Sequence, residues 1–145
     1  MSSTARLVFC EQDGRWATRI SGELGRYGRE VCSLQECQGQ LDEAPSSFFV
    51  VELTVGPIKS MIEFLTQARR RQPRARIVVV GKRSDLQWEW LLRDAGATAV
   101  VCDLHAAGEL VRLARRHFAN LPPTEATLRQ QIWDRLPWAD VATEH

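Results

Sequence analysis

Residues Phe48-Phe49-Val50-Val51-Glu52-Leu53 form a short apolar run that ends in a carboxylate. The run is rich in β-branched and aromatic residues, and the turn residues Pro45-Ser46 and Gly56-Pro57 bound it. This pattern predicts a strand buried on both faces, as at the centre of a parallel sheet. Open α/β sheets place their sites at the carboxyl ends of such strands. Glu52 is therefore the first candidate site residue.

Strand and helix patterns alternate five times along the chain around this run. The predicted strands cover residues 6–10, 30–34, 48–53, 76–81 and 98–102. Apolar residues at helical spacing follow four of these strands, while residues 35–43 fit either a polar helix or a loop. Ser84-Asp85-Leu86-Gln87 has the form of a capping box that opens the fourth helix. The alternation predicts a parallel sheet with right-handed crossovers and helices on both faces.

The length of 145 residues and the position of the prolines predict one domain and a C-terminal segment. Pro122-Pro123 end the alternation, so the domain is expected to cover residues 1–121. Residues 122–145 are expected to hold one extra helix and a tail. The apolar stripe of that helix consists of Leu128, Ile132, Trp133 and Leu136.

The composition is that of an ordinary globular protein, with 44% hydrophobic and 26% charged residues. No apolar run approaches the roughly 20 residues that span a bilayer, so no membrane association is expected. The amino terminus has no secretory apolar segment, which predicts a cytoplasmic protein. A net charge of +1 provides no general attraction to nucleic acid.

The reactive side chains show no spacing typical of a metal or cofactor site. The four cysteines, Cys10, Cys32, Cys37 and Cys102, lack the C-x-x-C pattern and are expected to be buried free thiols. The three histidines are scattered, and no phosphate-binding glycine loop or nucleophile elbow occurs. The sequence therefore predicts no enzyme, no metal and no cofactor.

The five strand–helix units, over about residues 6–119, resemble the receiver domain of bacterial two-component response regulators. The most specific local signal is Asp94-Ala95-Gly96-Ala97-Thr98-Ala99-Val100-Val101, which is similar to that family's passage from the fourth helix into the fifth strand. The resemblance implies an α/β, flavodoxin/CheY-like three-layer sandwich. Its five-stranded parallel sheet would have the order 2-1-3-4-5 and a site at the carboxyl edge, with the extra C-terminal helix appended.

The resemblance also implies a phosphorylation site, from which this sequence departs. Active receivers use an acceptor carboxylate after the third strand, an acidic pair for Mg²⁺ after the first, a hydroxyl after the fourth and a lysine after the fifth. The acceptor position here is Glu52, and the acidic pair becomes Glu11 and Gln12. The hydroxyl position falls on Gly81 and the lysine position on Asp103.

These departures predict a pseudo-receiver that does not accept a phosphoryl group. An anion at Asp103 would repel the incoming phosphate, and the longer Glu52 side chain moves the attacking oxygen out of line. The chain is thus interpreted as a non-catalytic signalling module that acts through phosphorylation-independent protein–protein interaction. Glu52 would either mimic a phosphorylated aspartate or be a solvated residue in a decayed site. We favour the second interpretation because the hydroxyl and lysine partners are missing.

Two other functions remain open at this point. The first is an atypical receiver, still phosphorylated at Glu52 or binding a divalent cation there with Glu11, Asp13 and Asp103. Against the cation, Asp13 could point away and Asp103 ends a different strand. The second is a nucleic-acid-associated module that uses an arginine-rich edge around Arg69-Arg70-Arg71 and Arg116. No stacking aromatic residues accompany these arginines, which argues against nucleic acid.

An interaction surface is predicted on the outer side of the fourth helix. Leu86 and Trp90 lie opposite the residues expected to pack on the sheet, and tryptophan is enriched at interface hot spots. In the family this face, formed by the fourth helix, fifth strand and fifth helix, serves dimerisation and output. The expected partners are therefore signalling proteins, with a homodimer as one form. Alternatively, Trp133 or Leu136 of the C-terminal helix covers Trp90.

Overall fold

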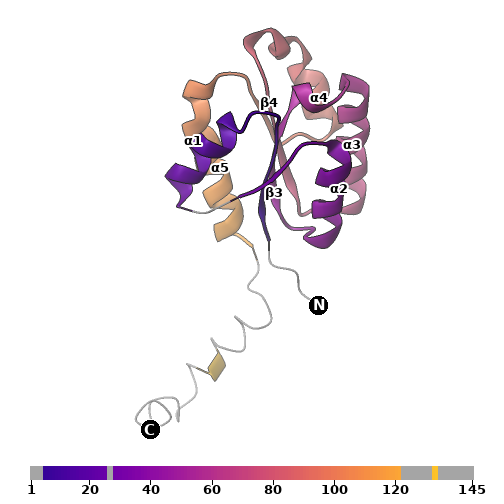
Figure 1. The fold of residues 1–145 in the computed structure, drawn as a ribbon. Helices are drawn as coiled ribbons and strands as arrows, with labels where there is room; N and C mark the ends of the chain where they lie inside the picture. Colours follow the sequence, from indigo (N-terminus) through magenta and orange to yellow (C-terminus); the bar gives the residue numbers. More distant parts are fainter. Residues whose placement is uncertain (1–4, 26–27, 122–131, 134–145) are drawn as a thin grey trace.

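The computed structural model describes residues 5–25, 28–121 and 132–133, and its centre is a five-stranded parallel sheet (Figure 1). The strands are β1 (Leu7–Cys10), β2 (Arg29–Val31), β3 (Phe48–Glu52), β4 (Arg76–Val80) and β5 (Ala99–Val101). Their order in the sheet is β2-β1-β3-β4-β5, and every neighbouring pair is parallel. The predicted fold class and strand order are thus confirmed.

Helices cover both faces of this sheet and complete the three layers. They are α1 (Arg15–Leu24), α2 (Leu34–Glu43), α3 (Ile58–Arg71), α4 (Glu89–Ala95) and α5 (Ala107–Ala119). Three 3-10 turns, η1 (Leu53–Val55), η2 (Arg83–Trp88) and η3 (Leu104–Ala106), follow β3, β4 and β5. Figure 1 shows α1 and α5 on one face of the sheet and α2 and α3 on the other.

The core alternates along β3 as the period of a strand requires. Phe49 and Val51 pack in the core layer beneath α2, α3 and α4. Phe48 and Val50 pack in the opposite layer, beneath α1 and α5. Glu52 continues the alternation of Phe48 and Val50, so its side chain leaves the sheet on the α1 side. Because side chains alternate between the two faces along β3, the Glu52 carboxylate lies on the same face of the sheet as α1.

The second strand is shorter than the sequence predicts because α2 begins early. Strand β2 ends at Val31, and the Ser33 hydroxyl accepts the backbone N–H of Glu36 at 3.2 Å. With this N-cap the helix begins at Leu34. Residues 35–43, which the sequence left open between a helix and a loop, are therefore helical. Cys32 then lies beyond the strand and is exposed, so the expectation that it is a buried thiol was wrong. The other cysteines are buried, as expected.

The capping box expected at Ser84 does not form. The chain instead enters the 3-10 turn η2, where the Asp85 carboxylate accepts the backbone N–H of Lys82 at 2.8 Å. Helix α4 therefore begins only at Glu89. Its two sides are as predicted, since Leu92 is buried against the sheet and Trp90 is exposed.

Among the described residues, no helix is both long and apolar enough to cross a membrane. Most of the predicted C-terminal segment, including Leu128 and Leu136, lies outside the described residues. Its assignment as a separate helix and tail stays a prediction. The two described residues of that segment, Ile132 and Trp133, are both exposed.

Candidate functional site

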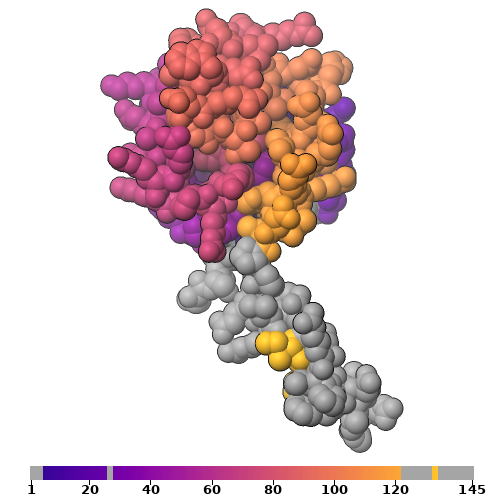
Figure 2. Space-filling model, turned by 180° about the vertical axis from the view of Figure 1, so that it is seen from behind, coloured from indigo at the N-terminus to yellow at the C-terminus, as the bar shows by residue number. Residues whose placement is uncertain are grey.

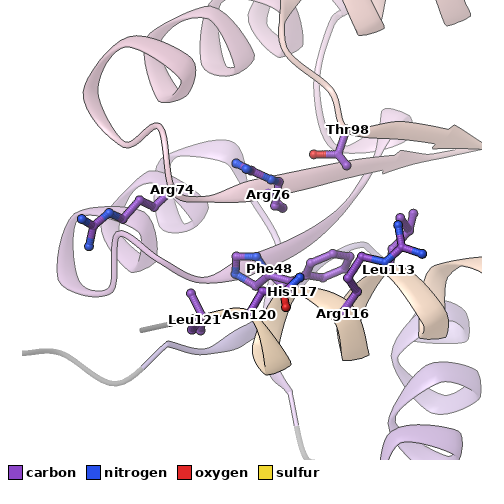
Figure 3. A pocket seen from close by; sticks show the side chains of 9 residues that line it. All are labelled: Phe48, Arg74, Arg76, Thr98, Leu113, Arg116, His117, Asn120 and Leu121. Atoms are coloured by element: carbon purple, nitrogen blue, oxygen red, sulfur yellow. The ribbon is translucent and has the colours of Figure 1, made fainter. Parts of the chain in front are cut away.

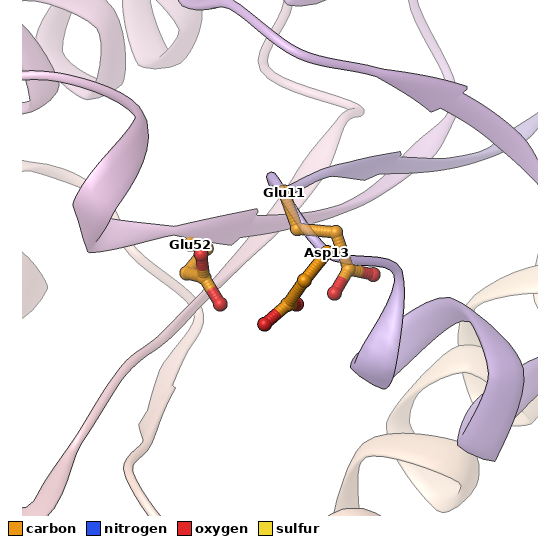
Figure 4. Close-up of side chains that lie close together, drawn as sticks. All are labelled: Glu11, Asp13 and Glu52. Carbon is orange, nitrogen blue, oxygen red and sulfur yellow. The ribbon is translucent and has the colours of Figure 1, made fainter.

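Two buried carboxylates meet at the carboxyl edge of the sheet, between β1 and β3. Cys10 pairs with Val51 in the parallel register, so the next residues, Glu11 and Glu52, leave neighbouring strands side by side. Their exposed fractions are only 5% and 4%. Figure 4 shows both side chains on the side of the sheet where α1 begins. Buried carboxylates require partners, and those partners define what this site does.

Glu11 is the cap of α1. Its Oε1 accepts the backbone N–H of Trp16 at 3.0 Å, and its Oε2 accepts that of Ala17 at 2.7 Å. Gly14, which precedes the helix, has a φ of 73° and no side chain with which to cap it. The carboxylate of Glu11 thus satisfies two amide groups that the first turn leaves free, and it complements the positive end of the helix dipole.

The surroundings of Glu11 raise its pKa above the ordinary value. Burial has the largest effect, and the negative charges of Glu52 and Asp13 add to it. The amide groups of Trp16 and Ala17 oppose the change because they stabilise the charged form. Glu11 therefore retains a proton to a higher pH in the folded protein than in the unfolded chain.

A hydroxyl and a cation reach the Glu52 carboxylate, although the hydroxyl and the lysine expected of an active receiver are missing. The Thr54 hydroxyl, from η1, donates to Glu52 Oε1. Arg15, at the start of α1, places Nη2 3.8 Å from Glu52 Oε2 and Nε 2.8 Å from Asp13 Oδ2. Neither group comes from the positions after β4 and β5 that the resemblance identified, since Thr54 follows β3 and Arg15 begins α1. In the sequence, the only sign of these contacts is that Arg15 follows Asp13, and Thr54 follows Glu52, by two residues. At that spacing two side chains can meet.

Asp13, not Gln12, completes the acidic group. One oxygen from each of Glu11, Asp13 and Glu52 lies within 4.8 Å of the others, and Figure 4 shows the Asp13 carboxylate between the other two. The suggestion that Asp13 points away was wrong. Gln12 is exposed and its Nε2 donates to the backbone carbonyl of Thr54 at 3.4 Å.

A carboxylate lies beside Gly81, the position that the resemblance assigns to a hydroxyl. A Cβ atom built on Gly81 would lie 2.5 Å from Asp85 Oδ2. Asp85 is held there because it accepts the amide of Lys82. Any side chain at Gly81 would have to displace this carboxylate. The arrangement therefore places an anion next to the position where active receivers have a hydroxyl donor.

Asp103, at the lysine position, pairs away from Glu52. Its Oδ1 accepts the backbone N–H of His105 at 2.9 Å, and Arg83 Nη2 lies 3.6 Å from its Oδ2. The hydrogen bond from His105 is the main reason that the pKa of Asp103 is lowered, and Arg83 contributes. Asp103 is thus charged at neutral pH, but its side chain belongs to the η2–η3 surface.

A five-stranded parallel sheet of this order, with helices on both faces, is the CheY-like fold. Solved structures of that fold are similar to this chain. A candidate response regulator from Chloroflexus aurantiacus aligns with a TM-score of 0.64 and 15% identity, over 81% of this chain and 100% of its own. A CheY-like protein, TadZ, from Pseudomonas aeruginosa aligns with a TM-score of 0.60 and 21% identity, over 83% of this chain and 98% of its own.

A third structure is the NtrC4 receiver domain, solved as a beryllofluoride-activated dimer. It aligns with a TM-score of 0.61 and 13% identity, over 77% of this chain and 96% of its own. No family model matches the sequence, and no curated protein matches it. At these identities the similarity concerns the fold, and the function has to be argued from the site.

Proposed function

We propose that this protein is a receiver-like signalling module that binds protein partners and does not use phosphorylation. The observation that carries the proposal is the burial of Glu52 together with the contacts that its carboxylate makes. This carboxylate is buried, accepts the Thr54 hydroxyl and lies beside the Arg15 guanidinium. Its oxygens are already engaged, so attack on a phosphodonor would require breaking both contacts. A cytoplasmic location belongs to the same proposal.

The surroundings of Glu52 also disfavour a phosphoryl group once attached. Asp85 fills the space next to Gly81, and Asp103 replaces the lysine that would bind a phosphoryl oxygen. Neither position therefore provides the donor or the cation that would hold a phosphoryl oxygen. We infer that Glu52, which accepts the Thr54 hydroxyl, helps to fix the conformation of the loop after β3.

The proposed binding surface is the outer side of η2, α4, β5 and α5. Leu86 is 47% exposed and Trp90 is 71% exposed. A groove of about 440 Å³ adjoins Leu86 and is floored by Val100, Val101 and Cys102. In Figure 2 the salmon segment with η2 and α4 and the orange segment with α5 lie side by side on one face. A partner that inserts apolar side chains would suit this face, and a second copy is one such partner.

We predict that a small phosphodonor does not modify the protein. After incubation with acetyl phosphate and Mg²⁺, the intact mass should be that of the unmodified chain, since Glu52 is engaged and no lysine stands at position 103. The Glu52→Gln variant is the matched control. A phosphoryl adduct on the native chain that is missing from Glu52→Gln would contradict the proposal and favour an atypical receiver.

Loss of the exposed indole should weaken association. We propose that the native chain forms a homodimer through this face. In sedimentation equilibrium, Trp90→Ser should raise the dissociation constant of that homodimer about tenfold or more, as expected for a hot-spot tryptophan. Arg70→Ser, at the exposed end of α3, is the control and should leave it unchanged. Equal dissociation constants for Trp90→Ser and the native chain would remove this face from the proposal.

A second candidate function is binding of a divalent cation at the acidic group. It is favoured by one observation, the approach of oxygens from Glu11, Asp13 and Glu52 to within 4.8 Å. Against it, Glu11 uses both oxygens to cap α1, and Arg15 already neutralises part of the charge of the other two. The site is therefore proposed to contain an internal cation, the guanidinium, in the position that a metal ion would need.

A further inference from the structure

Exposed arginines gather at the amino edge of the sheet, at the end opposite Glu52. They lie in the last turn of α3, in the loop before β4, at the first residue of β4 and in the last turn of α5. These residues, which we call the arginine edge, are Arg69, Arg70, Arg71, Arg74, Arg76 and Arg116. The concentration of positive charge contrasts with a net charge of only +1 for the whole chain.

Among the described residues, no carboxylate forms an ion pair with the arginine edge. Arginines elsewhere in the domain do pair with carboxylates, as Arg6, Arg15, Arg19, Arg83 and Arg93 show. At the edge, Arg69 Nη1 donates to the backbone carbonyl of Asp94 at 2.8 Å, and Arg76 Nη1 donates to that of Pro73 at 2.9 Å. A carbonyl group has no net charge, so these two contacts hold the side chains in place without neutralising them.

The positive charge of the edge exceeds what the neighbouring helix ends require. Helices α3 and α5 both end there, and the carboxyl end of a helix carries about half a negative charge. The arginines outnumber these partial charges. The edge therefore has positive charge left over, which attracts an anionic partner.

Two adjoining pockets, of about 510 and 180 Å³, lie between these side chains. Arg76 and Thr98 line both pockets, Arg69 lines the smaller one, and no lining residue of either is acidic. Figure 3 shows Arg74 and Arg116 at opposite ends of the larger pocket, with Arg76 on the strand above it. The guanidinium groups are thus spread along the edge and do not converge on one point. This spacing fits an extended anion with several charges better than a single small one.

We propose that the arginine edge binds an acidic segment of a partner protein in an extended conformation. Successive Asp or Glu side chains of that segment would lie on the guanidinium groups of the two pockets. A guanidinium group presents its donors in a planar fork that matches the two oxygens of a carboxylate. The edge lies away from both Glu52 and the surface around Trp90, so this proposal is independent of the proposed function.

The aromatic residues of the edge favour an acidic peptide over a nucleic acid. Single-stranded nucleic acid is bound through aromatic rings on which successive bases stack. Phe48 lines the larger pocket but is only 1% exposed, and the His117 ring packs on it with 5.8 Å between the ring centroids. The His117 ring is itself held by its Nε2, which is 2.6 Å from the Ser46 carbonyl. The edge therefore provides cations without a row of stacking rings.

Fluorescence anisotropy on the full chain tests the proposal, with a labelled polyglutamate peptide of about ten residues as the probe. The peptide should bind saturably at low ionic strength, and added sodium chloride should weaken the binding because exposed charges are screened. A polyglutamine peptide of the same length should not bind. The absence of saturable polyglutamate binding at submillimolar protein concentration would overturn the proposal. Equal or tighter binding of oligothymidylate of the same length would also overturn it and assign the edge to nucleic acid.

A pair of charge-matched variants separates the arginine edge from the net charge of the protein. The double variant Arg74→Gln/Arg116→Gln should lose about tenfold or more in affinity for polyglutamate. Arg19→Gln/Arg83→Gln removes the same charge from α1 and η2, outside the edge, and should change the affinity less than about twofold. Equal losses in the two variants would overturn the proposal. Thermal unfolding checks that both variants are folded, and Trp90→Ser should bind polyglutamate like the native chain.

Discussion

Replacing Glu11 with alanine is expected to lower the free energy of unfolding by about 2–4 kcal/mol. The change leaves the amides of Trp16 and Ala17 without their acceptor at a place where little water reaches them. It also removes the negative charge from the positive end of the α1 dipole. Urea unfolding followed by circular dichroism at neutral pH measures the loss.

Asp13→Ala is the control, because Asp13 belongs to the same acidic group but is exposed. Its ion pair with Arg15 is half in solvent, so its removal should cost less than about 1 kcal/mol. If the two alanine variants unfold at the same urea concentration, the capping role assigned to Glu11 is wrong.

The Glu11 carboxyl should also give stability a pH dependence whose sign follows from its pKa. The folded-state pKa is raised above the ordinary value of 4.5, so the folded protein binds more protons than the unfolded chain between the two values. The contribution of Glu11 to stability therefore falls as the pH rises through this window and is constant above it. The difference in free energy of unfolding between the native chain and Glu11→Gln should decline over the same window. A rising difference would contradict the assignment.

Replacing Arg15 with glutamine is expected to convert the acidic group into a divalent-cation site. Without the guanidinium, the Asp13 and Glu52 carboxylates lose the nearest positive charge, and Glu52 remains buried. Carboxylate oxygens are the ligands preferred by Mg²⁺ and Ca²⁺. Calorimetric titration with MgCl₂ and CaCl₂ should show affinity about tenfold or more above that of the native chain.

Arg19→Gln is the matched control for this experiment. Arg19 lies on the next turn of α1 and pairs with Glu23 at 3.6 Å, so it carries the same charge on the same helix. This variant should bind the cations as weakly as the native chain. Affinity that is unchanged in Arg15→Gln would refute the role of Arg15 as an internal cation. Adding Glu52→Gln to Arg15→Gln should abolish the gained binding.

Much of the fold could be predicted because buried apolar residues recur along the sequence with the period of a strand or a helix. The run at Phe48–Glu52 and the run at Arg76–Val80 indicated central strands, and both form. The exposure of Trp90 also followed from helical spacing. Where prediction failed, local side-chain chemistry competed with the pattern: the Ser33 cap shortened β2, and Asp85 replaced the expected capping box.

The sequence by itself determined the layers, the order of the elements and the presence of carboxylates at the carboxyl edge, because hydrophobic period and turn residues act locally. Only the tertiary structure decided the partners of those carboxylates. Arg15 and Glu52 are distant in sequence and meet because β1 and β3 pair in one register. Such contacts depend on how whole elements pack together, which a local sequence pattern does not encode.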